Sequence, residues 1–459
     1  MQRMSTADAT IHWLSATHPS DTFTILCIDA PGAPISMDAV VRQLYERAQR
    51  VDDLCLGVLN VPGDLDRPYW VRSEVRPDAF VVHSARTWRD CLDKVGELAD
   101  DQLDPTENTW RIHVFGPLTG APRGWADKDG EAIVVALQIS HTLGDGRAIA
   151  AICLGLFDAA RPEGPARAVV SGSGRPQLLR WRLAAAGMAC LPVSVGATAF
   201  RWLRWNIEYR KALRSGWLTS WPTGAPPTEL NRSPGPGRTV RVIVLDRRSF
   251  PTGYSVTAAI LTAISYAVDE LIGPASRRTA VVPVALPLQP GSHNNVVNVS
   301  IDLHVEIDAV GERMSRIADE LTAIQKRASA PNPVLDAAVR FDSAVPAFLM
   351  RRGLRRFVTD AAPDIVPGVT IVSSVNTESA DLSPVGSRPD LPLAGGKIRF
   401  ATGFPYLTES MGLGHGVIGV GAVVTISVIT SPDIVDADAY VDMLRRALDR
   451  VAAGGSPQP

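Results

Sequence analysis

The sequence contains few cysteines, and their spacing excludes several kinds of site. Only five of the 459 residues are cysteine, an odd number, and no two of them have a CxxC or Cys/His ligand spacing. They are Cys27, Cys55, Cys91, Cys153 and Cys190. We therefore expect no metal site, and this cysteine usage fits a reducing cytoplasm best.

The chain also lacks an excess of charge of either sign. It holds 46 basic and 48 acidic residues, and its formal net charge is −2. No global field therefore favours nucleic acid or an anionic membrane, and partners must be recognised locally. Residues 1–30 contain no continuous apolar core, because Asp8, His12, His18 and Asp21 interrupt it, so we expect no secretion through a signal peptide.

Several recognisable motifs and repeats are missing as well. The sequence has no Walker loop, no zinc-ligand spacing, no dinucleotide fingerprint and no repeat of short fixed period. Its length predicts two domains or more, and prolines and glycines gather between residues 160 and 240. We expect an N-terminal lobe over residues 1–175, a linking helical segment over 176–238 and a C-terminal lobe over 239–459.

Hydrophobic periodicity predicts alternating strands and helices in both lobes. In the N-terminal lobe we expect strands at 23–28 and 133–139 and helices at 37–50, 88–98 and 148–157. In the C-terminal lobe we expect strands at 239–245, 279–286, 294–303, 369–376 and 416–430, and helices at 255–271, 309–326 and 436–453. This alternation is typical of an α/β or α+β fold.

An apolar stretch rich in alanine and glycine lies in the linking segment, at residues 183–200. Arginine and tryptophan flank it over residues 180–217, and such flanks are typical of a membrane interface. The stretch is short for a spanning helix, and Pro192 interrupts it, so we do not predict a transmembrane segment. Two alternatives stay open: a helical hairpin packed over both lobes, or an interfacial helix among lipid headgroups.

The most informative stretch covers residues 133–146, where an apolar run ends at His141 and Asp145 and Gly146 follow. The run predicts a strand buried on both faces, and the glycines at 144 and 146 permit a sharp turn after it. A neutral imidazole at a strand end could take a proton from a hydroxyl near neutral pH. A lone histidine at a strand end is more often structural than catalytic, so the rest of the sequence has to decide between the two roles.

Short motifs along the chain supply that context. The relevant segments are residues 4–9, 67–71, 103–110, 140–146, 291–296 and 372–376. Together they resemble the motifs of the bacterial wax ester synthase/acyl-CoA:diacylglycerol acyltransferase family, within the chloramphenicol-acetyltransferase-like and condensation-domain superfamily. Three departures stand out: Ser140 replaces the first of two histidines, Asn-Thr replaces Pro-Leu before Trp110, and no Pro-Gly-Pro accompanies Asn376.

The resemblance implies two chloramphenicol-acetyltransferase-like α/β lobes, with mixed sheets flanked by helices, a long helical linker and a channel between the lobes. It implies that His141 acts as the base of an acyl-CoA-dependent O-acyltransferase, with acyl-CoA as a substrate and no cofactor. Asp145 would pair with an arginine and hold the loop. Oxyanion donors could be the Ser140 hydroxyl, the Gly146 N–H or the amides of Asn295 and Asn376, of which we rank Asn376 first.

The resemblance leaves the substrates and the surroundings of the protein open. A hydroxyl acceptor, lipidic as in wax ester or triacylglycerol synthesis, is the first expectation, with Trp110 in the core or at the substrate. The arginines at 351–356 could contact CoA phosphates or anionic lipid, or form a solvated helix face. We expect a cytoplasmic protein, with contact to the inner membrane face or a lipid droplet as an option, and no nucleic acid partner.

Two alternatives to this function remain. The acyl group could come from a carrier protein, as in condensation domains, or the chain could be a degenerate homologue that binds lipid or a partner protein without catalysis.

Overall fold

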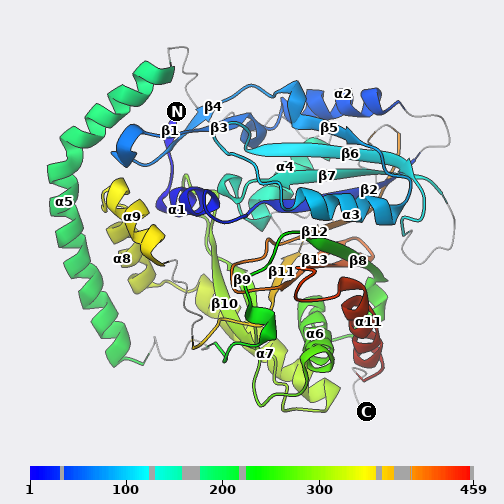
Figure 1. Ribbon diagram of the computed structural model, residues 1–459. Helices are drawn as coiled ribbons and strands as arrows, with labels where there is room; N and C mark the ends of the chain where they lie inside the picture. The colour runs from blue at the N-terminus through cyan, green and yellow to red at the C-terminus, as the bar shows by residue number, and fades with distance from the viewer. Residues whose placement is uncertain are drawn as a thin grey trace.

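The structure is a computed structural model, and it describes residues 1–30, 36–122, 130–157, 176–216, 224–357, 364–376, 393 and 395–454. Two large β-sheets flanked by helices form two lobes, and a long helix lies at one side of them (Figure 1). The predicted fold class is confirmed.

The N-terminal lobe is built on a five-stranded mixed sheet, in the order β12-β2-β7-β6-β5. Its strands are β2 (Thr22–Asp29), β5 (Phe80–His83), β6 (Trp110–Leu118), β7 (Ala132–Ile139) and β12 (Ile398–Phe404). Its helices are α1 (Thr6–Ser15), α2 (Met37–Ala48), α3 (Trp88–Leu98) and α4 (Gly146–Phe157). A small sheet of β1 (Gln2–Arg3), β4 (Tyr69–Arg72) and β3 (Leu56–Leu59) adjoins it.

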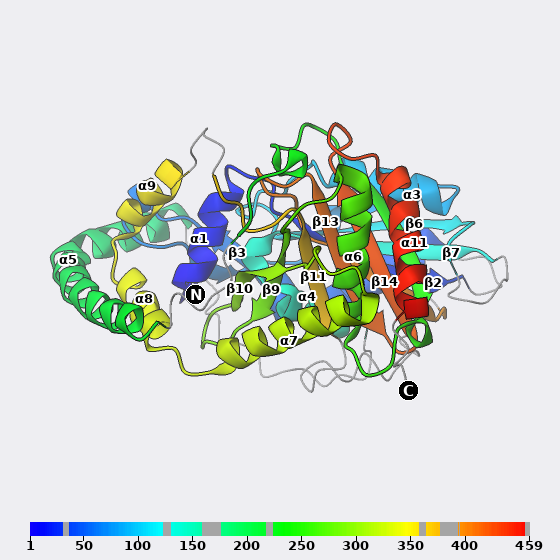
Figure 2. The same ribbon diagram turned by 90° about the horizontal axis from the view of Figure 1, so that it is seen from below.

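The C-terminal lobe is built on a six-stranded mixed sheet, in the order β10-β9-β11-β13-β14-β8. Its strands are β8 (Thr239–Asp246), β9 (Thr279–Ala285), β10 (Val296–Asp302), β11 (Ile371–Asn376), β13 (Leu413–Val420) and β14 (Val423–Thr430). The helices α6 (Val256–Ile272), α7 (Val310–Ser329) and α11 (Ala437–Gly454) share one hydrophobic core with it, and α6 and α11 lie side by side across its strands (Figure 2).

Burial explains why β7 is apolar throughout. Helices α2 and α4 share a core with one face of β7, whereas α3 and residues of the C-terminal lobe share a core with the other. All eight residues of the strand are buried. The prediction of a strand covered on both faces is therefore confirmed, and this strand is the support for the residues that follow it.

The C-terminal part of the chain contributes one strand to the N-terminal sheet. β12 pairs antiparallel with β2, with Ala401 opposite Leu26. It also packs closely on the larger sheet, where a Cβ on Gly416 of β13 would overlap the carbonyl oxygen of Gly403. The two sheets are thus joined by the chain itself and by a contact that only glycine permits.

The apolar stretch of the linking segment forms one continuous helix, α5 (Pro176–Arg214), so the predicted hairpin is wrong. Pro192 lies inside the helix without breaking it, because a single proline removes one backbone hydrogen bond and usually bends a helix. In Figures 1 and 2 α5 curves around the short helices α8 (Pro333–Asp342) and α9 (Ala347–Phe357), with its convex side outward.

Helix α5 carries an unusual number of exposed apolar side chains. Ten of the fifteen large hydrophobic side chains exposed in the described part of the chain belong to this helix. We call them the α5 outer face: Leu178, Trp181, Met188, Val193, Val195, Phe200, Trp202, Leu203, Ile207 and Leu213. Among the described helices, α5 is the one long and apolar enough to cross a membrane by length and composition.

Candidate active site

The end of β7 brings His141 to the boundary between the two lobes. The backbone N–H of Ser140 donates to the carbonyl oxygen of Thr109 at 3.0 Å, and residues His141–Leu143 then form a 3-10 turn. A Cβ on Gly144 would overlap the Ala148 side chain, so the turn between β7 and α4 needs a glycine there. The sequence prediction of a histidine at a strand end, followed by a sharp turn, is confirmed.

Asp145 caps the helix that follows and ties it to the other lobe. One carboxylate oxygen accepts the backbone N–H groups of Arg147, at 3.0 Å, and Ala148, at 3.2 Å. The other accepts the N–H of Asn295 from the C-terminal lobe at 2.8 Å. Among the described residues no arginine side chain pairs with Asp145 as predicted, and the Arg147 guanidinium donates to the carbonyl oxygens of Leu286 and Asn295 instead. The predicted structural role remains, supplied by backbone amides.

A second set of contacts crosses between the lobes at Asp8 of α1. This fully buried carboxylate accepts the backbone N–H groups of His293 and Asn294 and, at 3.0 Å, the Asn294 side-chain amide. The same amide donates to the carbonyl oxygen of His141 at 3.2 Å. The loop around residue 294 therefore holds the backbone of the turn that carries His141.

The His293 side chain lies between two carboxylates in this loop. Its ring nitrogens are 3.6 Å from Asp8 and 3.6 Å from Asp53, and the ring packs edge-on against Trp70. Burial opposes protonation of His293, but the two carboxylates outweigh it and raise its pKa to about 9. Burial likewise opposes ionisation of Asp8, yet the hydrogen bonds from His293 and Asn294 lower its pKa. The pair is thus charged at neutral pH.

A cavity of about 340 Å³ lies between the two lobes, and His141 lines it. Its walls come from β2, β12 and α4 of the N-terminal lobe and from β10, β11 and β13 of the C-terminal lobe, with single residues from α1 and β9. The contribution of α4 is one row at helical spacing: Gly146, Ile149, Ala150, Cys153, Leu154 and Phe157. The side chains of this row are mostly apolar, so the cavity suits a hydrocarbon chain that ends near His141.

His141 presents one ring nitrogen to this cavity. Its Nδ1 is enclosed by protein, which leaves Nε2 as the nitrogen that a substrate can reach. Burial lowers the pKa of His141, and a hydrogen bond to the backbone of His141 and the carboxylate of Asp145 offset this only in part. The ring is therefore neutral near pH 7 and can act as a base.

Two other cavity residues bear on the chemistry near His141. The ring of Tyr406, which follows β12, lies edge-on to His141 with 5.6 Å between ring centroids. Burial raises the pKa of Tyr406, so its hydroxyl stays protonated and can only donate or accept hydrogen bonds. Burial also raises the pKa of the Cys153 thiol to about 12, and a protonated thiol does not compete as a nucleophile.

The remaining predicted residues divide into those at the cavity and those away from it. Gly146 lines the cavity at the start of α4. Ser140 is fully buried and does not line it, and Trp110 lies in the core with its indole N–H donating to the carbonyl oxygen of Leu54. The Asn295 side chain is occupied within its own loop by Gln289 and Ser292.

Asn376, which we ranked first as an oxyanion donor, is the last residue of β11, and its side chain lies outside the described part of the structure. Asn298 of β10 does line the cavity, so it is a described amide that could reach a substrate there. In the sequence it is one of the polar positions that alternate with apolar ones along this strand. Tyr406 and the side chain of His293 carried no such signal, because their neighbours come from distant segments.

Other titratable clusters lie away from the cavity. Asp302, His304 and Glu306 are, among the described residues, the group close enough together to share a metal ion, and none of them lines the cavity. The buried His415 bonds to Thr370 and Tyr440 within the C-terminal core, and burial lowers its pKa to about 3. Such a ring is a neutral structural group.

Comparison with known proteins supports the fold. No protein-family model matches the sequence, and no curated protein matches it. Among solved structures, the chain is similar to a wax ester synthase/diacylglycerol acyltransferase from Marinobacter aquaeolei VT8, with a TM-score of 0.62 and 16% identity over 99% of this chain and 100% of that one.

The chain is also similar to the starter condensation domain of rhizomide synthetase. A variant of that domain in complex with C8-CoA gives a TM-score of 0.55 and 14% identity, over 100% of this chain and 96% of that one. A second variant, in complex with C8-CoA and Leu-SNAC, gives 0.54 and 12%, over 99% and 94%. The fold of the whole chain is therefore the two-lobed fold shared by these acyltransferases and condensation domains.

Proposed function

We propose that this protein is an O-acyltransferase that moves an acyl group from acyl-CoA to a hydroxyl acceptor. The observation that carries the proposal is the position of His141: a neutral imidazole opens with Nε2 onto a largely apolar cavity between two lobes. The similar condensation domain solved with C8-CoA supports a CoA thioester as donor.

The reaction follows from this geometry. The acceptor hydroxyl donates a hydrogen bond to Nε2 of His141, and its oxygen attacks the thioester carbonyl as the proton moves to the ring. The tetrahedral intermediate then collapses, the C–S bond breaks, and the imidazolium returns the proton to the CoA sulfur. The start of α4 at Gly146 and the amide of Asn298, which both line the cavity, would favour negative charge on the carbonyl oxygen. Both substrates are consumed without a covalent enzyme intermediate.

The shape of the cavity supports a fatty acyl group over acetyl. The row on α4 runs from Gly146 to Phe157, which corresponds to roughly 16 Å along the helix axis. Apolar side chains line this length, and exclusion of water there would protect the thioester from hydrolysis. We further propose a lipidic acceptor, as in wax ester or triacylglycerol synthesis, and a cytoplasmic protein at the inner membrane face.

The test compares His141→Ala with the wild type, using octanoyl-CoA and a series of alcohols and diacylglycerol. Removal of a general base should lower ester formation by roughly 10²–10⁴-fold. His304→Asn is the matched control, because it removes a histidine from a site away from the cavity and asparagine tolerates the positive φ of 47° there. Equal rates in His141→Ala and wild type would refute the role of the base.

The same assay separates the alternatives. If ester forms only with an acyl-loaded carrier protein and not with free acyl-CoA, the acyl donor is the carrier protein. That result would favour a condensation-type reaction. No transfer from any donor, together with stabilisation of the protein by octanoyl-CoA, would favour a binding protein without catalysis.

A further inference from the structure

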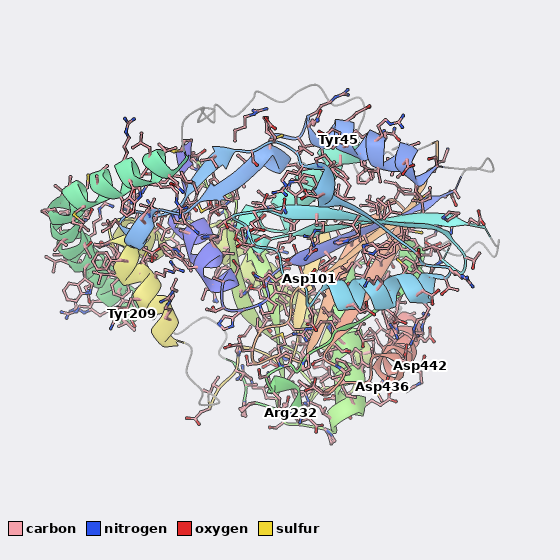
Figure 3. All side chains as sticks on the ribbon, turned by 45° about the horizontal axis from the view of Figure 1, so that its top comes forward. Tyr45, Asp101, Tyr209, Arg232, Asp436 and Asp442 are labelled. Atoms are coloured by element: carbon pink, nitrogen blue, oxygen red, sulfur yellow. The ribbon has the colours of Figure 1, made fainter. Side chains whose placement is uncertain are left out.

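The outer face of α5 combines exposed apolar side chains with basic ends. Its side chains project away from the rest of the molecule, on the side opposite Asp436 and Asp442 (Figure 3). Val193, near the middle of the helix, is 74% exposed. Ten exposed apolar side chains on one helix mark an interaction site, because their contact with water is unfavourable.

The charges on α5 are distributed in a way that identifies a partner. The helix contains seven basic residues and one acidic residue, Glu208, although the chain as a whole has a net charge of −2. Residues 183–200 contain no charge at all, so the basic side chains lie at the two ends. Trp181 and Trp202 stand at the borders between the apolar middle and the basic ends. Tryptophan and arginine in these places match the headgroup level of a bilayer.

We propose that the outer face of α5 binds the surface of an anionic lipid bilayer, with the helix parallel to the membrane. The convex middle around Val193 enters the boundary of headgroups and acyl chains. The curved ends keep their exposed arginines among the phosphates: Arg182, Arg204, Arg210 and Arg214. This assignment does not depend on the proposed acyl transfer.

Contacts of the inner side of α5 exclude a spanning orientation. Near its start, Arg180 donates to the carbonyl oxygen of Asn60, and Gly187 packs closely on Leu65. Further along, Thr198 donates to the carbonyl oxygen of Ala344, and Trp205 stacks on Phe341 of α8. A spanning helix would carry these polar segments of the N-terminal lobe and the α8 region into hydrocarbon, where their backbone groups lack partners. A parallel helix leaves them in water.

The same charges argue against a second copy of the chain as the occupant. Two α5 outer faces packed together would bring two sets of basic side chains into one interface with few acidic partners. Phosphate headgroups neutralise them instead.

The position of α5 also suits lipid substrates. Helix α1 contacts α9, which α5 surrounds, and Ile11 of α1 lines the cavity that holds His141. Helix α1 therefore connects the membrane-facing side of the molecule with one wall of the cavity.

The experiment is flotation of the full chain with vesicles of phosphatidylcholine, alone and mixed with phosphatidylglycerol. We expect the wild type to float with the anionic vesicles and to be released by salt. The affinity of the double variant Val193→Glu, Val195→Glu for these vesicles should fall by roughly tenfold or more. Both valine side chains are exposed, and each glutamate adds a negative charge that the headgroups repel. Val82→Glu, at an exposed valine of β5, is the matched control and should float as the wild type does.

Three results would overturn the proposal. The first is a wild type that floats with neither vesicle, and the second is a double variant that floats as well as the wild type. The third is a lipid-free wild type that does not float and is dimeric by light scattering, with a double variant that is monomeric, which would assign the face to a second copy. An unchanged melting temperature shows that the variant folds, and its transfer rate with water-soluble substrates reports separately on the proposed function.

Discussion

Replacement of His293 by glutamine should change how the stability of the protein depends on pH. In the wild type the His293 side chain is 5% exposed and lies between Asp8 and Asp53, with Trp70 packed against it. Glutamine is of similar size and can donate hydrogen bonds through its amide, but it cannot carry the positive charge. The substitution therefore removes the ion pairs and leaves the backbone N–H groups on Asp8 in place.

The magnitude follows from the pKa of His293, which is about 9 in the folded protein and about 6.5 in an unfolded chain. A difference of this size corresponds to roughly 3 kcal/mol of stability. Because the folded pKa is raised, that stability is fully present below about pH 6.5 and is lost as the pH rises through 9. For a chain of this length unfolding as one unit, the loss amounts to roughly 3 °C in Tm.

The assay is urea or thermal unfolding of wild type and His293→Gln at intervals from pH 6 to pH 10. The difference in unfolding free energy should be largest at pH 6 and should shrink toward pH 10. His113 and His415 do not interfere, because burial lowers their pKa values to about 4 and about 3 and their folded-state titration lies below this window. A difference that stays constant across the range would refute the charged state of His293.

Three further outcomes are expected. Asp145→Asn should lower stability by about 1–3 kcal/mol, measured by urea unfolding, and transfer by more than tenfold, since an amide cannot accept all three backbone N–H groups. Ala150→Trp should fill the cavity and lower the rate with octanoyl-CoA while sparing acetyl-CoA, and equal effects on both would place the acyl chain elsewhere. Because burial lowers the pKa of His141, kcat/KM should hold down to pH 6.5 and fall only below it, whereas a fall centred above pH 7 would contradict a lowered pKa.

Periodicity predicted those elements whose environment is uniform along their length. The helix at Trp88–Leu98 and the strand at 133–139 agree with α3 and β7 because one face of α3, and both faces of β7, are buried throughout. The strand β12 was missed, since its partner β2 is more than 350 residues away and its glycine contact with β13 depends on the final packing. The continuity of α5 was missed because Pro192 was read as a break in the helix. The contact of α5 with α8, which stabilises the helix, involves a segment distant in the sequence.

The candidate site was predictable as far as its residues are contiguous. His141, Asp145 and Gly146 follow one strand and lie together at one end of the cavity. Tyr406 and His293 reach the site from the C-terminal lobe, through loops whose course depends on how the two sheets meet. The packing of the two sheets against each other cannot be predicted from the spacing of residues in the sequence.

Two of the departures from the family motifs, at Ser140 and Thr109, fall at buried positions that do not line the cavity. Ser140, in place of the first histidine, is fully buried behind the turn, and its backbone N–H bonds to Thr109. Thr109 stands where the family has leucine, and its hydroxyl donates to the carbonyl oxygen of Leu56 in the core. His141 and Asp145, which the motif retains, both line the cavity. These two substitutions therefore change the packing beneath the candidate site and not the residues that line the cavity.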